Sequence, residues 1–199
     1  PKAIICENSS GSPSFSGSAT AVESGATTGV YDVDVVWVRD TAQGGNVLNL
    51  ALIYEDNSNQ GFVSISTVSG VSISDLGAGQ IFASSSTGSG DFNGPYGVYD
   101  TQFDKLVIAY KDTGASNELS VITATLSGTT LTYDTEVTSS FSTVSNVGIG
   151  FDSSVNKSVI AFKLTGASHT GGAAVFQASG TQENLTTENF IGTSAHSAA

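Results

Sequence analysis

The sequence predicts an all-β protein built from repeated four-stranded antiparallel meanders that are arranged like the blades of a β-propeller. One hairpin pattern recurs three times, at 95–112, at 147–163 and, more loosely, at 30–56. A Ser-Gly dipeptide recurs at positions 10, 69, 127 and 179, at spacings of 59, 58 and 52 residues. A period slightly above ~50 residues is near the length of a propeller blade. Charged residues make up only 12% of a chain rich in Gly, Ser and Thr, which favours short strands and tight turns over helices.

The repeat spacing divides the chain into three recognisable units and a partial one. Residues 1–29 are the partial unit, because Ala3–Cys6 and Ser14–Glu23 match the strands on either side of a Ser-Gly turn. The chain therefore enters in the middle of a unit. The complete units are expected at 30–85, 95–140 and 144–180, which gives a β-propeller-like repeat domain over 1–180. Residues 181–199 are interpreted as a linker or as the start of a following domain.

Within the first complete unit, Tyr31–Val38 alternates, with Val33, Val35 and Trp37 on one face. The run 39–46 (RDTAQGGN) follows as a hairpin whose Gly-Gly-Asn tip supplies the positive-φ residues of a tight turn. The remaining strands are expected at Leu48–Tyr54, at Phe62–Val68 and from Val71 onward.

In the later units, two runs are apolar on both faces, which is typical of strands buried on both sides. They are Lys105–Lys111 and Ser158–Lys163. The other expected strands are Tyr96–Asp100, Leu119–Leu126 and Leu131–Val137 in one unit, and Val147–Phe151 and Ala173–Gln177 in the other. No fourth strand is predicted in the last unit, where the polar run Thr181–Gly192 stands in its place.

Composition excludes several classes of function. The chain carries a net charge of −12 and six basic residues, which form no patch that could neutralise nucleic-acid phosphates. No apolar run approaches the ~18 residues needed to span a membrane as a helix. Cys6 is the only cysteine and is expected to be buried as a small hydrophobe. No nucleophile, metal-ligand or nucleotide-binding motif occurs, so we expect no catalytic residues, no metal, no cofactor and no enzymatic activity.

Two kinds of side chain are candidates for binding. The carboxylates at hairpin tips, such as Asp100, Asp104 and Asp152, could hold Ca²⁺, but Asp at such positions more often caps turns, which is the interpretation we favour. Loop aromatics could grip sugar rings. The ligand-contact candidates come from the loops Ser84–Gly94 and Gly114–Asn117 and their borders: Asp91, Phe92, Tyr96 and Asn117.

FDSSVNKSVIAFK, YDTQFDKLVIAYKD and the Ser-Gly turns resemble the β-propeller-like repeats of bacteriophage tail-fibre and other virion-associated proteins. Those repeats read Tyr/Phe-Asp, four or five residues, Lys-Val-Val-Ile-Ala-Tyr-x-Asp, a strand and Ser-Gly-Thr. The run ENLTTENFIG resembles the phrase that follows such repeats. The first complete unit departs from the pattern, because LNLALIYED lacks the initial lysine and its hairpin tip is longer.

This resemblance implies a non-enzymatic protein of the virion: a tail fibre, a spike or a capsid-attached fibre that mediates attachment to the host surface. The expected partners are other virion proteins, a host surface glycan and further copies of the chain. Two alternatives remain open from the sequence. One is a secreted or cell-surface bacterial adhesin or filament subunit with the same repeats, and the other is a carbohydrate-active propeller enzyme.

Overall fold

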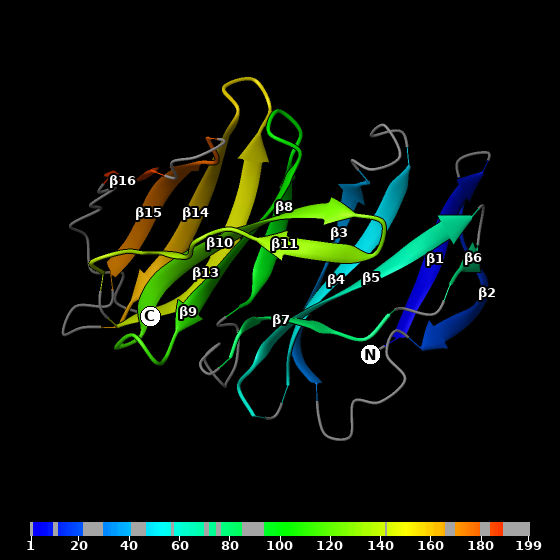
Figure 1. Cartoon of the computed structure of the whole chain (residues 1–199), viewed down its shortest axis with the longest axis horizontal. Helices are drawn as coiled ribbons and strands as arrows, with labels where there is room; N and C mark the ends of the chain where they lie inside the picture. The colour runs from blue at the N-terminus through cyan, green and yellow to red at the C-terminus, as the bar shows by residue number, and fades with distance from the viewer. Residues whose placement is uncertain are drawn as a thin grey trace.

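The computed structural model confirms an all-β protein with antiparallel sheets (Figure 1). It describes residues 2–9, 12–21, 30–40, 47–56, 58–69, 72–74, 77–84, 94–141, 143–165, 170–179 and 184–188. Within these ranges the chain forms sixteen strands and no helix. The predicted hairpin tip at 41–46 lies outside the described residues.

The strands form one hairpin and three larger sheets, each connected as a meander. The hairpin consists of β1 (Lys2–Ser9) and β2 (Ser12–Ala21). Sheet 1 contains β3 (Val30–Arg39), β4 (Leu48–Asp56), β5 (Gly61–Ser69), β6 (Ser72–Ile73) and β7 (Gln80–Ala83). Sheet 2 contains β8 (Tyr96–Asp100), β9 (Lys105–Asp112), β10 (Glu118–Ser127), β11 (Thr130–Tyr133) and β12 (Val137–Thr138). Sheet 3 contains β13 (Val144–Asp152), β14 (Lys157–Leu164), β15 (Thr170–Gln177) and β16 (Asn184–Glu188).

The fourth strand of each meander differs from the sequence prediction. In sheet 1 it is split into β6 and β7, which both pair with β5, and in sheet 2 into β11 and β12, which both pair with β10. Sheet 3 does have a fourth strand: β16 pairs with β15 from Ala173↔Glu188 to Gln177↔Asn184. The prediction of no strand in this run was therefore wrong. The polar, Thr-rich side chains of this run do not show the apolar pattern of a strand, and the strand forms because its backbone pairs with β15.

Each of the three sheets has a residue with positive φ shortly before the regular pairing of its first two strands begins. Asp32, Gly94 and Asn146 all have positive φ, at 44°, 91° and 51°. Each lies two residues before a pair that begins the regular ladder: Asp34↔Ile53, Tyr96↔Ala109 and Gly148↔Ala161. In β3 and β13 a register shift coincides with this residue. Gly and Asx residues tolerate this conformation best, which accounts for the residue types found there.

Sheet 2 is the middle layer of the stack, and its two faces contribute to two different cores (Figure 1). We call the face of a sheet that looks toward the preceding sheet its leading face, and the opposite face its trailing face. The leading face of sheet 2 includes Leu106 and Ile108 and packs on sheet 1. Its trailing face includes Val107 and Ala109 and packs on sheet 3. The predicted burial of β9 on both sides is confirmed, since its residues 106–110 are at most 1% exposed.

The predicted burial of the equivalent strand β14 on both sides was wrong. Ile160 and Phe162, on the leading face of sheet 3, are 0% and 4% exposed. Val159 is 44% exposed, and Ala161 beside it on the trailing face is also exposed. The physical reason is position in the stack: within the described residues no further sheet covers this side.

Candidate functional site

The connections between strands gather at two opposite ends of sheets 2 and 3. One end carries the hairpin tips 101–104 and 153–156, and we call it the hairpin end (Figure 1). The other end carries the turn 113–117 and the passage 139–143 from sheet 2 to sheet 3, and we call it the connection end. The two sets separate because successive strands of an antiparallel meander reverse direction.

Hydrogen bonds tie neighbouring segments to one another at the connection end and at the equivalent end of sheet 1. The amide of Val144 donates to the carbonyl of Asn117 at 2.8 Å, which joins the start of sheet 3 to a turn of sheet 2. In sheet 1, Gln60 Nε2 donates to the carbonyl of Ser84 at 2.9 Å. Asn117 and Thr143 have φ of 61° and 65°. The hydrogen bonds hold the turns of this end in defined positions, and the surrounding structure supports the positive φ of Asn117 and Thr143.

Carboxylates cap the equivalent turns that follow β4 in sheet 1 and β9 in sheet 2. Asp56 Oδ1 accepts hydrogen bonds from the amides of Ser58 and Gln60, each at 2.9 Å. Asp112 Oδ1 accepts from the amides of Gly114 and Ala115 at 2.8 and 3.2 Å. In both turns a side-chain oxygen replaces a backbone acceptor.

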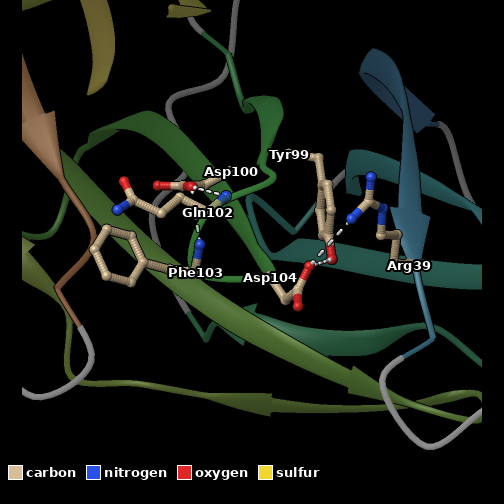
Figure 2. A network of polar contacts seen from close by, with 6 residues as sticks. All are labelled: Arg39, Tyr99, Asp100, Gln102, Phe103 and Asp104. Atoms are coloured by element: carbon tan, nitrogen blue, oxygen red, sulfur yellow. Dashed lines mark hydrogen bonds and ion pairs between the residues drawn. The ribbon is translucent and has the colours of Figure 1, made fainter. Parts of the chain in front are cut away.

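At the hairpin end the candidate calcium ligands have the same role. Asp100 is buried, and its Oδ1 accepts hydrogen bonds from the amides of Gln102 and Phe103 at 2.9 and 3.1 Å (Figure 2). Asp152 Oδ1 accepts from the hydroxyl and the amide of Ser154 at 2.6 and 2.8 Å. These bonds, the hydroxyl first, lower the pKa of the Asp152 carboxyl. The turn-capping interpretation is thus confirmed for both carboxylates.

A polar contact at the hairpin end joins sheets 1 and 2 (Figure 2). Tyr99 donates its hydroxyl to Asp104 Oδ1 at 3.1 Å, and Arg39 Nη1 lies 3.8 Å from the same oxygen. Burial and then the hydrogen bond to Asp104 raise the pKa of Tyr99. The ion pair is more than 40% exposed on both sides, so it contributes at most about 1 kcal/mol to stability. The apolar core between the two sheets, which includes Val36 and Ile108, contributes most of what holds them together.

The structure describes two of the four residues that the sequence predicts to contact a ligand, Tyr96 and Asn117. Asp91 and Phe92 lie outside the described residues. Tyr96 is half-buried at the start of β8 and packs against the core between sheets 2 and 3. Burial first, and then the nearby carboxylates of Asp32 and Asp34, raise its pKa.

Asn117 lies at the connection end, in the turn between β9 and β10, and is partly exposed. The sequence placed this residue in a loop, and the structure adds that the turn is bonded to the passage between sheets.

A cleft that the sequence did not predict lies between the β1–β2 hairpin and the leading face of sheet 1. Its volume is about 520 Å³. Cys6 contributes to its wall and is exposed, so the prediction that this thiol is buried was wrong. The sequence did contain a signal, because Trp37 and the alternating valines before it mark an apolar face. The lining residues are Ile4, Cys6, Val33, Asp34, Val35, Trp37, Leu50, Leu52, Val68 and Ile73.

In the part of the chain that the structure describes, no three His, Cys, Asp or Glu side chains gather in a way that could hold a metal ion. The same residues include no helix long and apolar enough to cross a membrane.

Comparison with known protein families, with curated proteins and with solved structures found no match to this chain.

Proposed function

We propose that this chain is a structural module of a bacteriophage virion appendage, such as a tail fibre, spike or capsid-attached fibre, and that it attaches to a glycan of the host surface through its connection end. We also propose that its meanders are repeats arranged as the blades of a β-propeller. The resemblance of FDSSVNKSVIAFK and YDTQFDKLVIAYKD to virion repeats supports both proposals. The second proposal is also supported by the strand order that the three sheets share and by the positive-φ residue that precedes the first regular strand pair in each.

The observation that carries the attachment proposal is the bonded connection end. Its turns combine exposed amide and hydroxyl groups with a backbone fixed by hydrogen bonds, as between Val144 and Asn117. Loops held on a stacked β core commonly carry binding residues, and a fixed loop loses little conformational entropy when it binds. The predicted contact residues Asp91 and Phe92 belong to the connection from sheet 1 to sheet 2, which ends at β8.

The chemistry favours a neutral or weakly charged sugar. A chain with net charge −12 repels acidic polymers, whereas amides and hydroxyls donate and accept hydrogen bonds as sugar hydroxyls do. Each such contact is weak, so holding a virion requires several copies that act together. Avidity from a multivalent appendage can exceed the single-site affinity by about 10²–10⁴.

Asn117→Gly tests the proposal, with Asn156→Gly as the matched control. Both asparagines lie in turns with positive φ, 61° and 54°, but at opposite ends of the stack. Glycine adopts this conformation without strain, so both variants should fold. We expect Asn117→Gly to weaken binding to host cells or to an arrayed glycan at least threefold and Asn156→Gly to leave it unchanged. Equal binding by all three proteins would contradict attachment through this end.

A further inference from the structure

The apolar stripe on β3 is half exposed, unlike the equivalent surfaces deeper in the stack. Val33, Val35 and Trp37 are 49%, 54% and 50% exposed. On the other face of the same strand, Val36 and Val38 are only 9% and 0% exposed, because they pack on sheet 2. A contiguous apolar surface of this kind, in a chain otherwise rich in hydroxyl groups, marks an interaction site.

The two interfaces within the chain show what covers a leading face in this fold. The leading face of sheet 2 is covered by β3 and β4, through residues such as Val36 and Ala51. The leading face of sheet 3 is covered by sheet 2, through Val107 and Ala109. In both cases the cover is a β-sheet, and strands within it present small or β-branched apolar side chains at alternate positions, as Ala51 and Ile53 do in β4 and Val107 and Ala109 do in β9.

On sheet 1 the corresponding cover is a two-stranded hairpin and not a full sheet. Strand β1 contacts β6 at the outer side of sheet 1, and the cleft remains between β1 and strands β3 and β4. Ile4 and Cys6 of β1 form one wall, and the buried side chains of Leu50 and Leu52 form the floor. The stripe on β3 forms the other wall.

Strand β1 also offers hydrogen-bonding groups to a ligand. Among the described residues it pairs with β2 and with no other strand, so its second edge has no strand partner. An exposed strand edge of this kind binds extended peptides by adding a strand, with alternate side chains entering adjacent pockets.

We propose that this cleft binds one extended β-strand from another polypeptide. The strand pairs with β1 and lays alternate small or β-branched side chains on Val35, Trp37 and Leu52. Successive side chains of a strand, which rises ~3.3 Å per residue, point to opposite faces. Three contacts on one face therefore require a strand of about six residues. Lysine at the ends of the strand suits the site, because the chain carries a net charge of −12. This inference does not depend on the attachment function proposed above.

A peptide with the sequence of 157–164, KSVIAFKL, is the probe, because its Val159 and Ala161 correspond to the covering residues Val107 and Ala109. Trp37 is the only tryptophan of the chain and reports on the site directly. Addition of the peptide should shift Trp37 emission to shorter wavelength in a saturable way and reduce its quenching by acrylamide. A peptide with Asn at both covering positions should bind at least tenfold more weakly.

Val35→Asn and Val155→Asn are matched variants of the protein, since the two valines are 54% and 56% exposed and only the first lines the cleft. Anisotropy of a labelled peptide should show at least tenfold weaker binding to Val35→Asn and unchanged binding to Val155→Asn. Asn117→Gly should bind the peptide normally, which separates this site from the attachment surface.

Three results would overturn the proposal. The first is no saturable binding of the peptide to the intact chain, and the second is equal loss of binding in the two valine variants. The third is a blue shift of Trp37 that depends on protein concentration alone, because the occupant would then be a face of a second folded copy and not a single strand.

Discussion

The substitution Ala109→Asp, compared with Ala161→Asp, tests the stacking of the sheets most directly. The two alanines occupy equivalent places in the runs VIAYK and VIAFK, and both lie on the trailing face of their sheet. Ala109 is 0% exposed and packs between sheets 2 and 3, whereas Ala161 is exposed. The same change in nearly the same local sequence therefore meets two different environments.

The expected loss of stability follows from the cost of burying a carboxylate. Full burial raises the pKa of such a group by about 3–5 units, from about 3.9 to about 7–9. At pH 7 the folded chain therefore holds this carboxyl largely protonated, and because each pH unit above the unfolded-state pKa corresponds to 1.36 kcal/mol, the loss of stability is about 4 kcal/mol in addition to the cost of burying the neutral group. A typical domain has a total stability of about 5–15 kcal/mol. Ala109→Asp should leave the chain unfolded or close to it. Ala161→Asp should change the free energy of unfolding by less than about 0.5 kcal/mol.

Chemical denaturation followed by circular dichroism, with Ala109→Asn as the neutral comparison, separates charge from size. The raised folded-state pKa of the new carboxyl means that its charge penalty grows as pH rises above about 4. The stability gap between the Asp and Asn variants at position 109 should thus be small near pH 4 and wide at pH 7. Equal losses at positions 109 and 161, or a wild-type melting curve for Ala109→Asp, would refute the layered arrangement.

Three further predictions follow from the packing. Gly97→Ala should destabilise the chain by about 1–3 kcal/mol in the same denaturation assay, because a Cβ there would collide with the side chain of Ile53 on β4 and press on that of Val36 on β3. Gly148→Ala is the control: a Cβ at this position meets open space, so the free energy of unfolding should be unchanged or slightly higher. Burial holds the pKa of Tyr110 above its ordinary value of 10.0, so the folded chain keeps this proton longer than the unfolded chain and stability should fall as pH rises above 10; Tyr110→Phe should flatten that part of the pH profile of the melting temperature. Cys6 is exposed, so a thiol reagent should label the native protein about as fast as the denatured one, and strong protection would contradict the open cleft.

Local structure was largely predictable from the sequence, because it depends on residues close together in the chain. Alternation placed Val33, Val35 and Trp37 on one face of a strand, and the structure agrees. The Asp residues before tight turns were expected to cap them, and Asp100 and Asp152 do. These features follow from the two-residue period of a strand and from the short reach of an Asp side chain.

The candidate contact residues were predictable only as positions in loops. Asn117 lies in the turn where the sequence placed it, but its bond to Val144 joins segments of two sheets. Tyr96 was expected at a loop border and instead packs toward sheet 3, because β8 lies between two layers. The cleft beside Trp37 depends on where the β1–β2 hairpin lies, and no local pattern specifies that position.

By itself, the sequence determined the all-β class, the hairpins and the side chains that share a face. The tertiary structure alone decided which of those faces are covered. VIAYK and VIAFK form equivalent strands, yet Ala109 is buried and Ala161 is exposed. The difference arises because burial depends on the neighbouring sheet, which is contributed by residues distant in the chain. The polar run at 184–188 is a strand for a similar reason. Its own side chains do not predict one, but β15 supplies the partners for its backbone hydrogen bonds.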